Sequence, residues 1–132
     1  MTSEVRFDWT QYKILVVEDH LEMLEVLCEL FGEQGATVYA AKNGLEAFQI
    51  VESQEIHFVL SDVQMPIMGG AELLQKIRAR NPEIPIVLLA TGHADLTEEG
   101  ALASGAVGLI HKPFQMLTLL EKVKSVLASI PI

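Results

Sequence analysis

The segment HFVLSDVQMP, residues 57–66, decides how this sequence is interpreted. Its short apolar run is typical of a buried strand, which we place at 57–61. The run stops at Asp62, and Pro66 prevents any continuation of the strand. In an α/β sheet, ligands bind in the crevice at the carboxyl ends of the strands. Asp62 is therefore a candidate functional carboxylate, although aspartate also serves as an ordinary turn residue.

Four further apolar runs and five helical patterns surround this segment. Strands are predicted at 36–40, 85–90, 107–111 and Lys13 to Val17, and helices at 20–34, 43–53, 70–80, 93–104 and 114–129. Gly35 predicts the end of the first helix, and Asn43 with Glu46 predicts the start of the second. Gly100 makes the fourth helix a weak one. The alternation predicts an α/β fold with a parallel sheet covered on both faces.

Residues 1–12 show no periodicity and are expected to form an N-terminal lead-in to one domain at 13–129. Within the lead-in, Phe7 and Trp9 either pack back on the domain or join it to a preceding one. On the first helix, the face expected to be buried carries Leu21, Leu24, Leu27, Cys28 and Phe31.

Composition excludes several classes of protein. Half of the 132 residues are hydrophobic, which predicts a globular chain. A formal net charge of −9 argues against direct binding to nucleic acid or to anionic membranes. Cys28 is the single cysteine, so we expect no disulfide framework. With neither a signal peptide nor an apolar run long enough to span a bilayer, a cytoplasmic protein is expected.

Polar residues stand at the carboxyl ends of four predicted strands. Glu18 and Asp19 follow the first strand, Asp62 the third, Thr91 the fourth and Lys112 the fifth. In a parallel sheet these ends share one edge, so three carboxylates would hinder each other's ionisation unless a divalent cation joins them. Magnesium suits this role because it binds a few carboxylates and keeps exchangeable waters. Each residue could also have a purely structural role, as a helix cap, a strand residue or a solvated loop residue. It is improbable that all of them have only such roles when they lie together on one edge of the sheet.

The segments VVEDH, SDVQMPIMGG, LLATG and HKPF resemble the receiver domain of bacterial two-component response regulators, over about residues 13–128. The resemblance implies a flavodoxin-like, doubly wound five-stranded sheet of order 2-1-3-4-5 with five helices. It implies a phosphoacceptor signalling domain that assists its own phosphorylation and dephosphorylation rather than an enzyme. The donor would be a phosphohistidine on a sensor histidine kinase or phosphotransfer protein.

The resemblance also assigns roles to individual residues. Asp62 would be the phosphoacceptor and, with Glu18, Asp19 and the backbone carbonyl of Gln64, would hold Mg²⁺ or Mn²⁺. Thr91 would be the switch hydroxyl and Lys112 the phosphate-binding lysine, followed by a cis bond to Pro113. Phosphorylation would switch the surface around the fourth and fifth strands and helices, and that face allows a homodimer.

Two positions depart from the family pattern. Leu109 stands three residues before the lysine, where the family usually has an aromatic ring, so ring rotation cannot report the signal here. The acid pair is Glu-Asp rather than Asp-Asp, which the family tolerates. On the first helix, Met23, Val26 and Leu30 widen the apolar arc, either to edge a docking surface for the donor or to cover neighbouring core.

Three other functions are alternatives to a phosphoaccepting receiver domain. A magnesium-dependent phosphatase with an aspartyl nucleophile would need Asp-x-Asp after the first strand, and the sequence there is Asp19-His20-Leu21. A flavodoxin-like cofactor binder would not place acids where phosphate sits. A degenerate receiver, acting as an unphosphorylated interaction module, is the serious alternative, but both Asp62 and Lys112 are present.

Overall fold

The computed structural model describes residues 7–130, and five parallel strands form one sheet of order β2-β1-β3-β4-β5. The strands are β1 (Lys13–Val17), β2 (Thr37–Ala41), β3 (Phe58–Asp62), β4 (Ile86–Thr91) and β5 (Gly108–His111). The helices are α1 (Leu21–Gln34), α2 (Gly44–Ser53), α3 (Gly70–Arg80), α4 (Glu98–Ala103) and α5 (Met116–Leu127). The predicted flavodoxin-like fold is confirmed.

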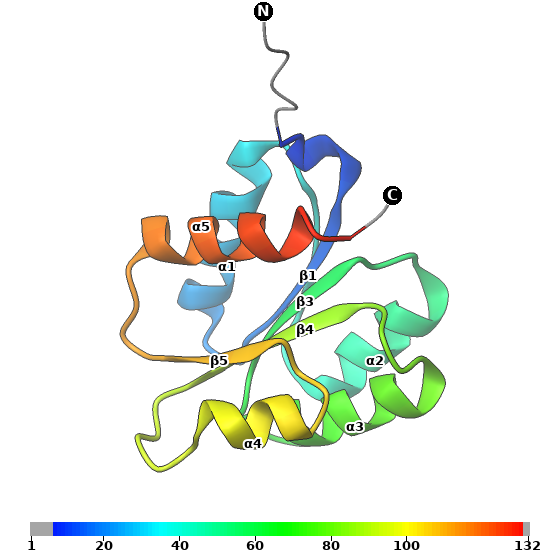
Figure 1. Cartoon of the computed structure of the whole chain (residues 1–132), viewed down its shortest axis with the longest axis vertical. Helices are drawn as coiled ribbons and strands as arrows, with labels where there is room; N and C mark the ends of the chain where they lie inside the picture. Colours follow the sequence, from blue (N-terminus) through cyan, green and yellow to red (C-terminus); the bar gives the residue numbers. More distant parts are fainter. Residues whose placement is uncertain (1–6, 131–132) are drawn as a thin grey trace, which may run out of the picture.

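The helices cover both faces of the sheet, α1 and α5 on one and α2, α3 and α4 on the other (Figure 1). Alternate residues of each strand therefore enter different cores: Ile14 packs with α1 and α5, and Leu15 with α2 and α3. The central strand β3 is buried along its whole length. Burying a large apolar side chain contributes roughly 1.5–3 kcal/mol, so these two layers hold the strand ends in place.

Two local signals read from the sequence act as expected. Gly35 ends α1 with a φ of 112°, in the left-handed region that glycine adopts without steric cost. The Asn43 side chain caps α2 by accepting a hydrogen bond of 2.9 Å from the backbone N–H of Glu46. The Glu46 carboxylate reaches back to the N–H of Lys42, at 3.0 Å.

The predicted start of the fourth helix was wrong. We expected it to begin at His93, but α4 begins at Glu98. Thr97 caps the helix, because its hydroxyl accepts a hydrogen bond of 3.1 Å from the N–H of Gly100. The preceding loop is held differently: its Leu96 carbonyl lies 3.1 Å from Nε2 of His111 on β5. A threonine followed by acids in the first turn is the start signal that we missed.

The predicted burial of Leu21 was also wrong. This side chain is 62% exposed, whereas Leu24, Leu27 and Phe31 on the same helix are buried. Leu21 is the first residue of α1, and the buried face of the helix begins one turn later, at Leu24.

The lead-in contributes aromatic packing where the structure describes it; residues 1–6 lie outside the described part. The ring of Phe7 stacks on Tyr12 at a centroid distance of 5.0 Å, and Trp9 lies 6.0 Å from Phe31 of α1. Phe7 and Trp9 therefore pack back on the domain. Within residues 7–130, no helix is both long and apolar enough to cross a bilayer.

Candidate functional site

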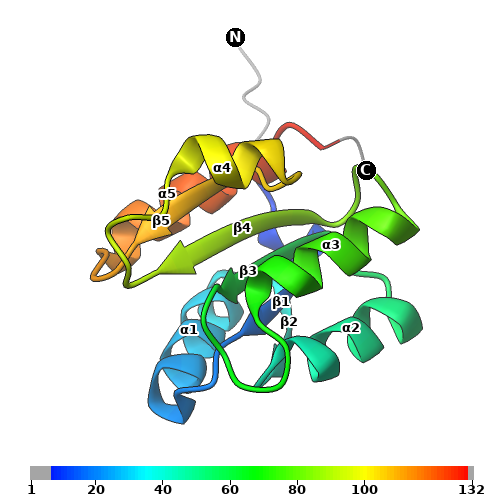
Figure 2. The ribbon, with the colours of Figure 1, turned by 90° about the horizontal axis from the view of Figure 1, so that it is seen from below.

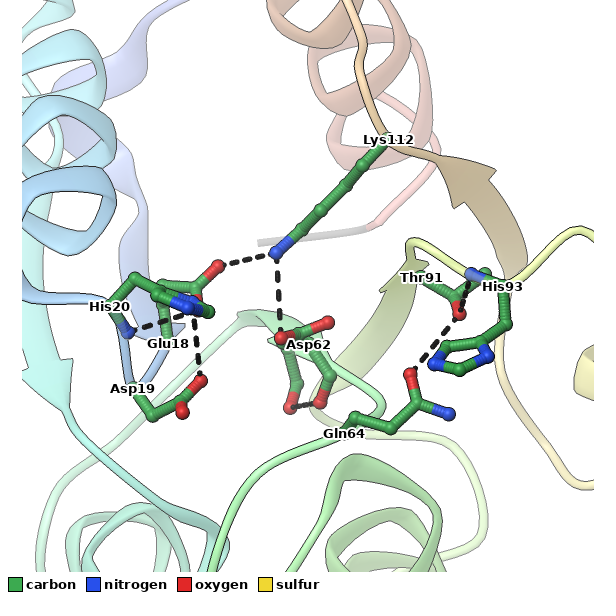
Figure 3. Close-up of polar contacts among 9 residues, drawn as sticks. Glu18, Asp19, His20, Asp62, Gln64, Thr91, His93 and Lys112 are labelled. Atoms are coloured by element: carbon green, nitrogen blue, oxygen red, sulfur yellow. Dashed lines mark hydrogen bonds and ion pairs between the residues drawn. The ribbon is translucent and has the colours of Figure 1, made fainter.

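The strand ends converge at one edge of the sheet, as Figure 3 shows. Glu18 directly follows β1, Asp62 and Thr91 end β3 and β4, and Lys112 directly follows β5. Three of these polar residues are buried: Glu18 is 1% exposed, Asp62 7% and Thr91 0%. Burial of so many polar groups is costly unless they are paired, so their partners define the site.

Lys112 joins two of the acids. Its Nζ lies 2.6 Å from Oε1 of Glu18 and 3.4 Å from Oδ2 of Asp62. Burial alone would lower the pKa of Lys112, but the hydrogen bond that it donates to Glu18 and the charge of Asp62 raise this pKa above its ordinary value. The lysine is therefore fully charged at neutral pH, and its shortest contact is with Glu18.

The two acids consequently differ in their protonation behaviour. Burial would raise the pKa of Glu18, but Lys112 and the backbone N–H of His20 bring it below its ordinary value. Burial raises the pKa of Asp62, and the negative charges of Glu18 and Asp19 add to this effect while Lys112 opposes it. Asp62 is thus the less well compensated of the two carboxylates, and a further cation would stabilise its ionised form.

Asp19 presents an oxygen for such a cation. Its Oδ1 is buried and accepts no hydrogen bond within the part of the chain that the structure describes. His20 Nδ1 lies 3.6 Å from this oxygen and 3.2 Å from Oε2 of Glu18. The donor atoms of Glu18, Asp19 and His20 all lie within 4.8 Å of one another. Asp62 is not in this compact group, and His20 is a neighbour of the site that the sequence analysis missed.

Thr91 is held by a contact that was not predicted. Its hydroxyl donates to Oε1 of Gln64 at 3.4 Å and accepts from the backbone N–H of His93 at 3.0 Å (Figure 3). Only the backbone carbonyl of Gln64 was expected at the site, and its side chain was not. The side chain of Gln64 therefore lies between the loop after β3 and the end of β4.

The loop after β3 is shaped by close backbone approaches. The N–H of Gly70 donates to the carbonyl of Val63 at 2.9 Å, and a Cβ on Gly70 would collide with the carbonyl oxygen of Asp62. Ile67 has a φ of 70°, which is costly for a β-branched residue, and it is 76% exposed. Strain of this kind is retained at functional loops. The Lys112–Pro113 bond is cis, as is Ile84–Pro85.

Leu109, the position that departs from the family pattern, is 6% exposed. It packs in the core layer beneath α3 and α4, together with Leu89 and Ala101. Its contacts are those of an ordinary core residue, with no polar atom that could follow a change at Asp62.

A parallel α/β sheet with acids and a lysine gathered at its carboxyl edge defines a domain whose functional site lies at that edge. The response regulator receiver domain family matches residues 14–124, and the chain belongs to this family. Sporulation initiation phosphotransferase F of Bacillus subtilis is 32% identical over 116 residues, covering 87% of this chain and 93% of that protein. The first relatives are longer: a CpxR homologue of Haemophilus influenzae is 35% identical, and the match covers 87% of this chain but 50% of that protein. The chain thus spans about half the length of such relatives.

Solved structures agree with the family. A CheY-like receiver domain from Methanospirillum hungatei has a TM-score of 0.82 and 31% identity, covering 89% of this chain and 94% of that one. The response regulator TrrA of Thermotoga maritima, solved in complex with Mg(2+)-BeF, has a TM-score of 0.76 and 31% identity, covering 87% and 98%. The predicted receiver domain, and with it a function in phosphorelay signalling, is confirmed.

Proposed function

We propose that Asp62 accepts a phosphoryl group from a phosphohistidine donor. The observation that carries this proposal is the position of the buried Asp62 carboxylate, 3.4 Å from Nζ of Lys112, at the edge where the strand ends meet. One carboxylate oxygen of Asp62 attacks phosphorus, forming an O–P bond. The N–P bond of the donor breaks, and its electron pair returns to the imidazole nitrogen, which then takes a proton.

Lys112 stabilises the negative charge of the equatorial oxygens during this transfer. It already spans Glu18 and Asp62, so it needs little movement to contact a phosphoryl oxygen. The hydroxyl of Thr91 bonds to Gln64 in this structure, and it exchanges that acceptor for a phosphoryl oxygen after transfer. This exchange moves the loop between β4 and α4 and changes the surface around β4, α4, β5 and α5.

We assign Mg²⁺ or Mn²⁺ to Asp19, Asp62 and the backbone carbonyl of Gln64, with Glu18 beside them. The unpaired Oδ1 of Asp19 and the raised pKa of Asp62 both fit a hard divalent cation. When bound, this cation supplies charge neutralisation that brings carboxylate and phosphoryl oxygens together. Glu18 is the least available of these ligands because Lys112 occupies its Oε1.

A hollow next to the site is the proposed docking place for the phosphohistidine-bearing protein. It has a volume of about 460 Å³ and is lined by Glu18, His20, Glu22, Met23, Val26 and Lys112. Val26 is 46% exposed, whereas Met23 and Leu30 are half-buried against the core. The docking surface is therefore centred on Met23 and Val26, which line the hollow, and it includes neither Leu21 nor Leu30. A structure showing a yeast receiver domain with a histidine phosphotransfer protein supports this class of partner, at 25% identity and a TM-score of 0.78.

The domain acts on its own aspartate and turns over no separate substrate, so we classify it as a signalling domain rather than an enzyme. A sensor histidine kinase or phosphotransfer protein in the cytoplasm is the proposed donor. The face formed by α4, β5 and α5 is the proposed surface for a homodimer.

Acetyl phosphate with Mg²⁺ tests the proposal directly. We expect one phosphoryl group per chain by intact-protein mass spectrometry, sensitive to hydroxylamine, and none in Asp62→Asn. Asp19→Asn keeps the acceptor but should require a higher Mg²⁺ concentration. Label on Asp62→Asn at the normal rate would refute the assignment. Turnover of the donor without an adduct would instead indicate a phosphatase, and no reaction in the wild-type protein would indicate a degenerate receiver.

A further inference from the structure

A second hollow lies away from the phosphorylation site, between α3 and α4. It has a volume of about 280 Å³, and its walls come from the loop after β3, from β4 and β5, and from the β4–α4 loop and α4. Figure 2 shows α3 and α4 on the same side of the sheet with β4 visible between them. Leu89 and Leu109, both nearly buried, form its apolar floor.

The hollow exists because the two helices present small side chains to it. Ala71 of α3 and Gly100, Ala101 and Ser104 at the end of α4 all line it. A Cβ on Gly100 would meet only the hydroxyl of Thr97, at 3.4 Å, so the space beyond is open. Packed interiors leave few voids larger than a water molecule, and an apolar cavity of about 150 Å³ is enough to bind benzene. This hollow therefore has room for one aromatic ring with a short substituent.

A half-buried positive charge lies beside the hollow. A larger depression of about 900 Å³ shares Ala71 and Ser104 with it and is also lined by Arg78. The guanidinium of Arg78 is half-buried, and its Nε donates to the carbonyl of Gly105 at 2.9 Å. In residues 7–130 no carboxylate lies within 4.0 Å of it, whereas Arg80 on the same helix pairs with Glu52 at 3.9 Å. A half-buried guanidinium without an acid favours an anionic ligand.

The charges orient such a ligand. Asp95 lines the small hollow, so it repels a carboxylate from the end where it lies. The larger depression carries one acid, Glu72, against two cations, Lys76 and Arg78, so its net charge is positive. Arg78 attracts the carboxylate to the junction that Ala71 and Ser104 mark. We propose that this hollow binds a small aromatic carboxylic acid, with its ring on Leu89 and Leu109 and its carboxylate on Arg78.

Binding at this place would also influence the switch, a consequence that rests on the proposed function. Leu96 and Thr97 belong to the wall, and they lie on the loop that follows Thr91. A ligand that holds this loop in one arrangement biases the movement that accompanies phosphorylation. By linkage, phosphorylation changes the affinity for the acid by the same factor that the acid changes the phosphorylation equilibrium.

The binding test uses the unphosphorylated protein and so does not depend on Asp62 chemistry. Phenylacetate is titrated into ¹⁵N-labelled protein, and we expect saturable shifts of the amide signals of Leu89, Ala101 and Leu109. Benzyl alcohol, which has the same ring without the charge, should bind at least tenfold more weakly, and so should benzylamine, whose ammonium group Arg78 repels. Equal affinity for the three probes, shifts confined to other regions, or no saturation at millimolar concentrations would overturn the proposal.

Variants on α3 supply matched controls. Ala71→Leu fills the junction at an exposed position, so it should abolish binding without unfolding the domain. Arg78→Gln should weaken the binding of phenylacetate at least tenfold and leave the affinity for benzyl alcohol unchanged. Arg80→Gln should change neither affinity. If Arg78→Gln fails to fold, the ratio of the three probes in the wild-type protein decides alone. Finally, the affinity for phenylacetate should differ at least twofold between the phosphorylated and the unphosphorylated protein. An affinity that phosphorylation leaves unchanged refutes the linkage but not the site.

Discussion

Replacing Lys112 by methionine should destabilise the fold strongly at neutral pH. The variant leaves Glu18, whose side chain is 2% exposed, without the ammonium group that lies 2.6 Å away. Breaking a buried ion pair by removing one partner costs roughly 3–5 kcal/mol. Lys112 is 25% exposed, and the N–H of His20 still donates to Glu18, so we expect a cost somewhat below this range, about 2–3 kcal/mol.

The effect should depend on pH in a defined direction. In the wild-type protein the pKa of Glu18 lies below its ordinary value of 4.5, so the pair stabilises the fold above pH 4.5. This contribution disappears as the pH falls through the lowered folded-state pKa. Without Lys112, burial raises the pKa of Glu18, which then takes a proton while the protein is still folded. The difference between the two proteins should therefore shrink steadily as the pH falls from 7 to 4.

Urea denaturation in the presence of EDTA measures both effects. Glu18→Gln with Lys112→Met forms a double-mutant cycle, in which the double variant should be more stable than the sum of the single changes predicts by about 1–3 kcal/mol. A midpoint for Lys112→Met equal to that of the wild-type protein at pH 7 would refute the reasoning. So would a destabilisation that is the same at pH 4 and pH 7.

Three further outcomes are expected. Asp62→Asn should stabilise the domain by on the order of 1 kcal/mol in urea denaturation at pH 7, because the raised pKa of Asp62 means that its charge destabilises the fold there. The gain in stability should vanish as the pH falls through that pKa, and a loss of stability at pH 7 would contradict this reasoning. Met23→Glu combined with Val26→Glu should slow transfer from the phosphotransfer partner at least tenfold while leaving labelling by acetyl phosphate intact; equal loss with both donors would mean structural damage. Hydrogen exchange of the β4–α4 loop and α4 should change on phosphorylation more than that of β5, and Thr91→Ala should weaken this response more than Leu109→Ala; the reverse order would place the switch on β5.

The sequence predicted the sheet and the residues at its edge for a simple reason. Strands such as FVLSD are buried on both faces, so they stand out as apolar runs, and four of the five runs end at or just before a polar residue of the site. Parallel pairing then brings those ends together whatever their separation along the chain. Asp62 and Lys112 were therefore placed at one edge before any contact between them was known.

The partition of roles within the site could not be predicted in this way. Glu18 and Asp19 are adjacent in sequence, yet Glu18 is buried on Lys112 while Asp19 keeps an unpaired oxygen. Which of two neighbouring acids takes the lysine depends on side-chain rotamers and on how far β5 extends. The contact between Gln64 and Thr91 has the same origin, because it joins side chains 27 residues apart.

The start of α4 was mispredicted because small residues satisfy a helical pattern without requiring it. The stretch after His93 is short of large apolar side chains, so its periodicity is weak. A cap at Thr97 and the contact of His111 with the Leu96 carbonyl decide the boundary instead. The first of these signals is local and readable from sequence, and the second depends on the position of β5.

The ion pair between Glu18 and Lys112 joins residues 94 positions apart, and this has a consequence for synthesis on the ribosome. While the chain emerges, β1 and β3 can pair before β5 exists, which brings Glu18 and Asp62 together without the ammonium group between them. Repulsion of the two carboxylates then opposes closure of the sheet edge until Lys112 has left the exit tunnel. The acceptor therefore acquires its charge environment only when nearly the whole domain is present, so a nascent or truncated chain should be a poor substrate for the donor.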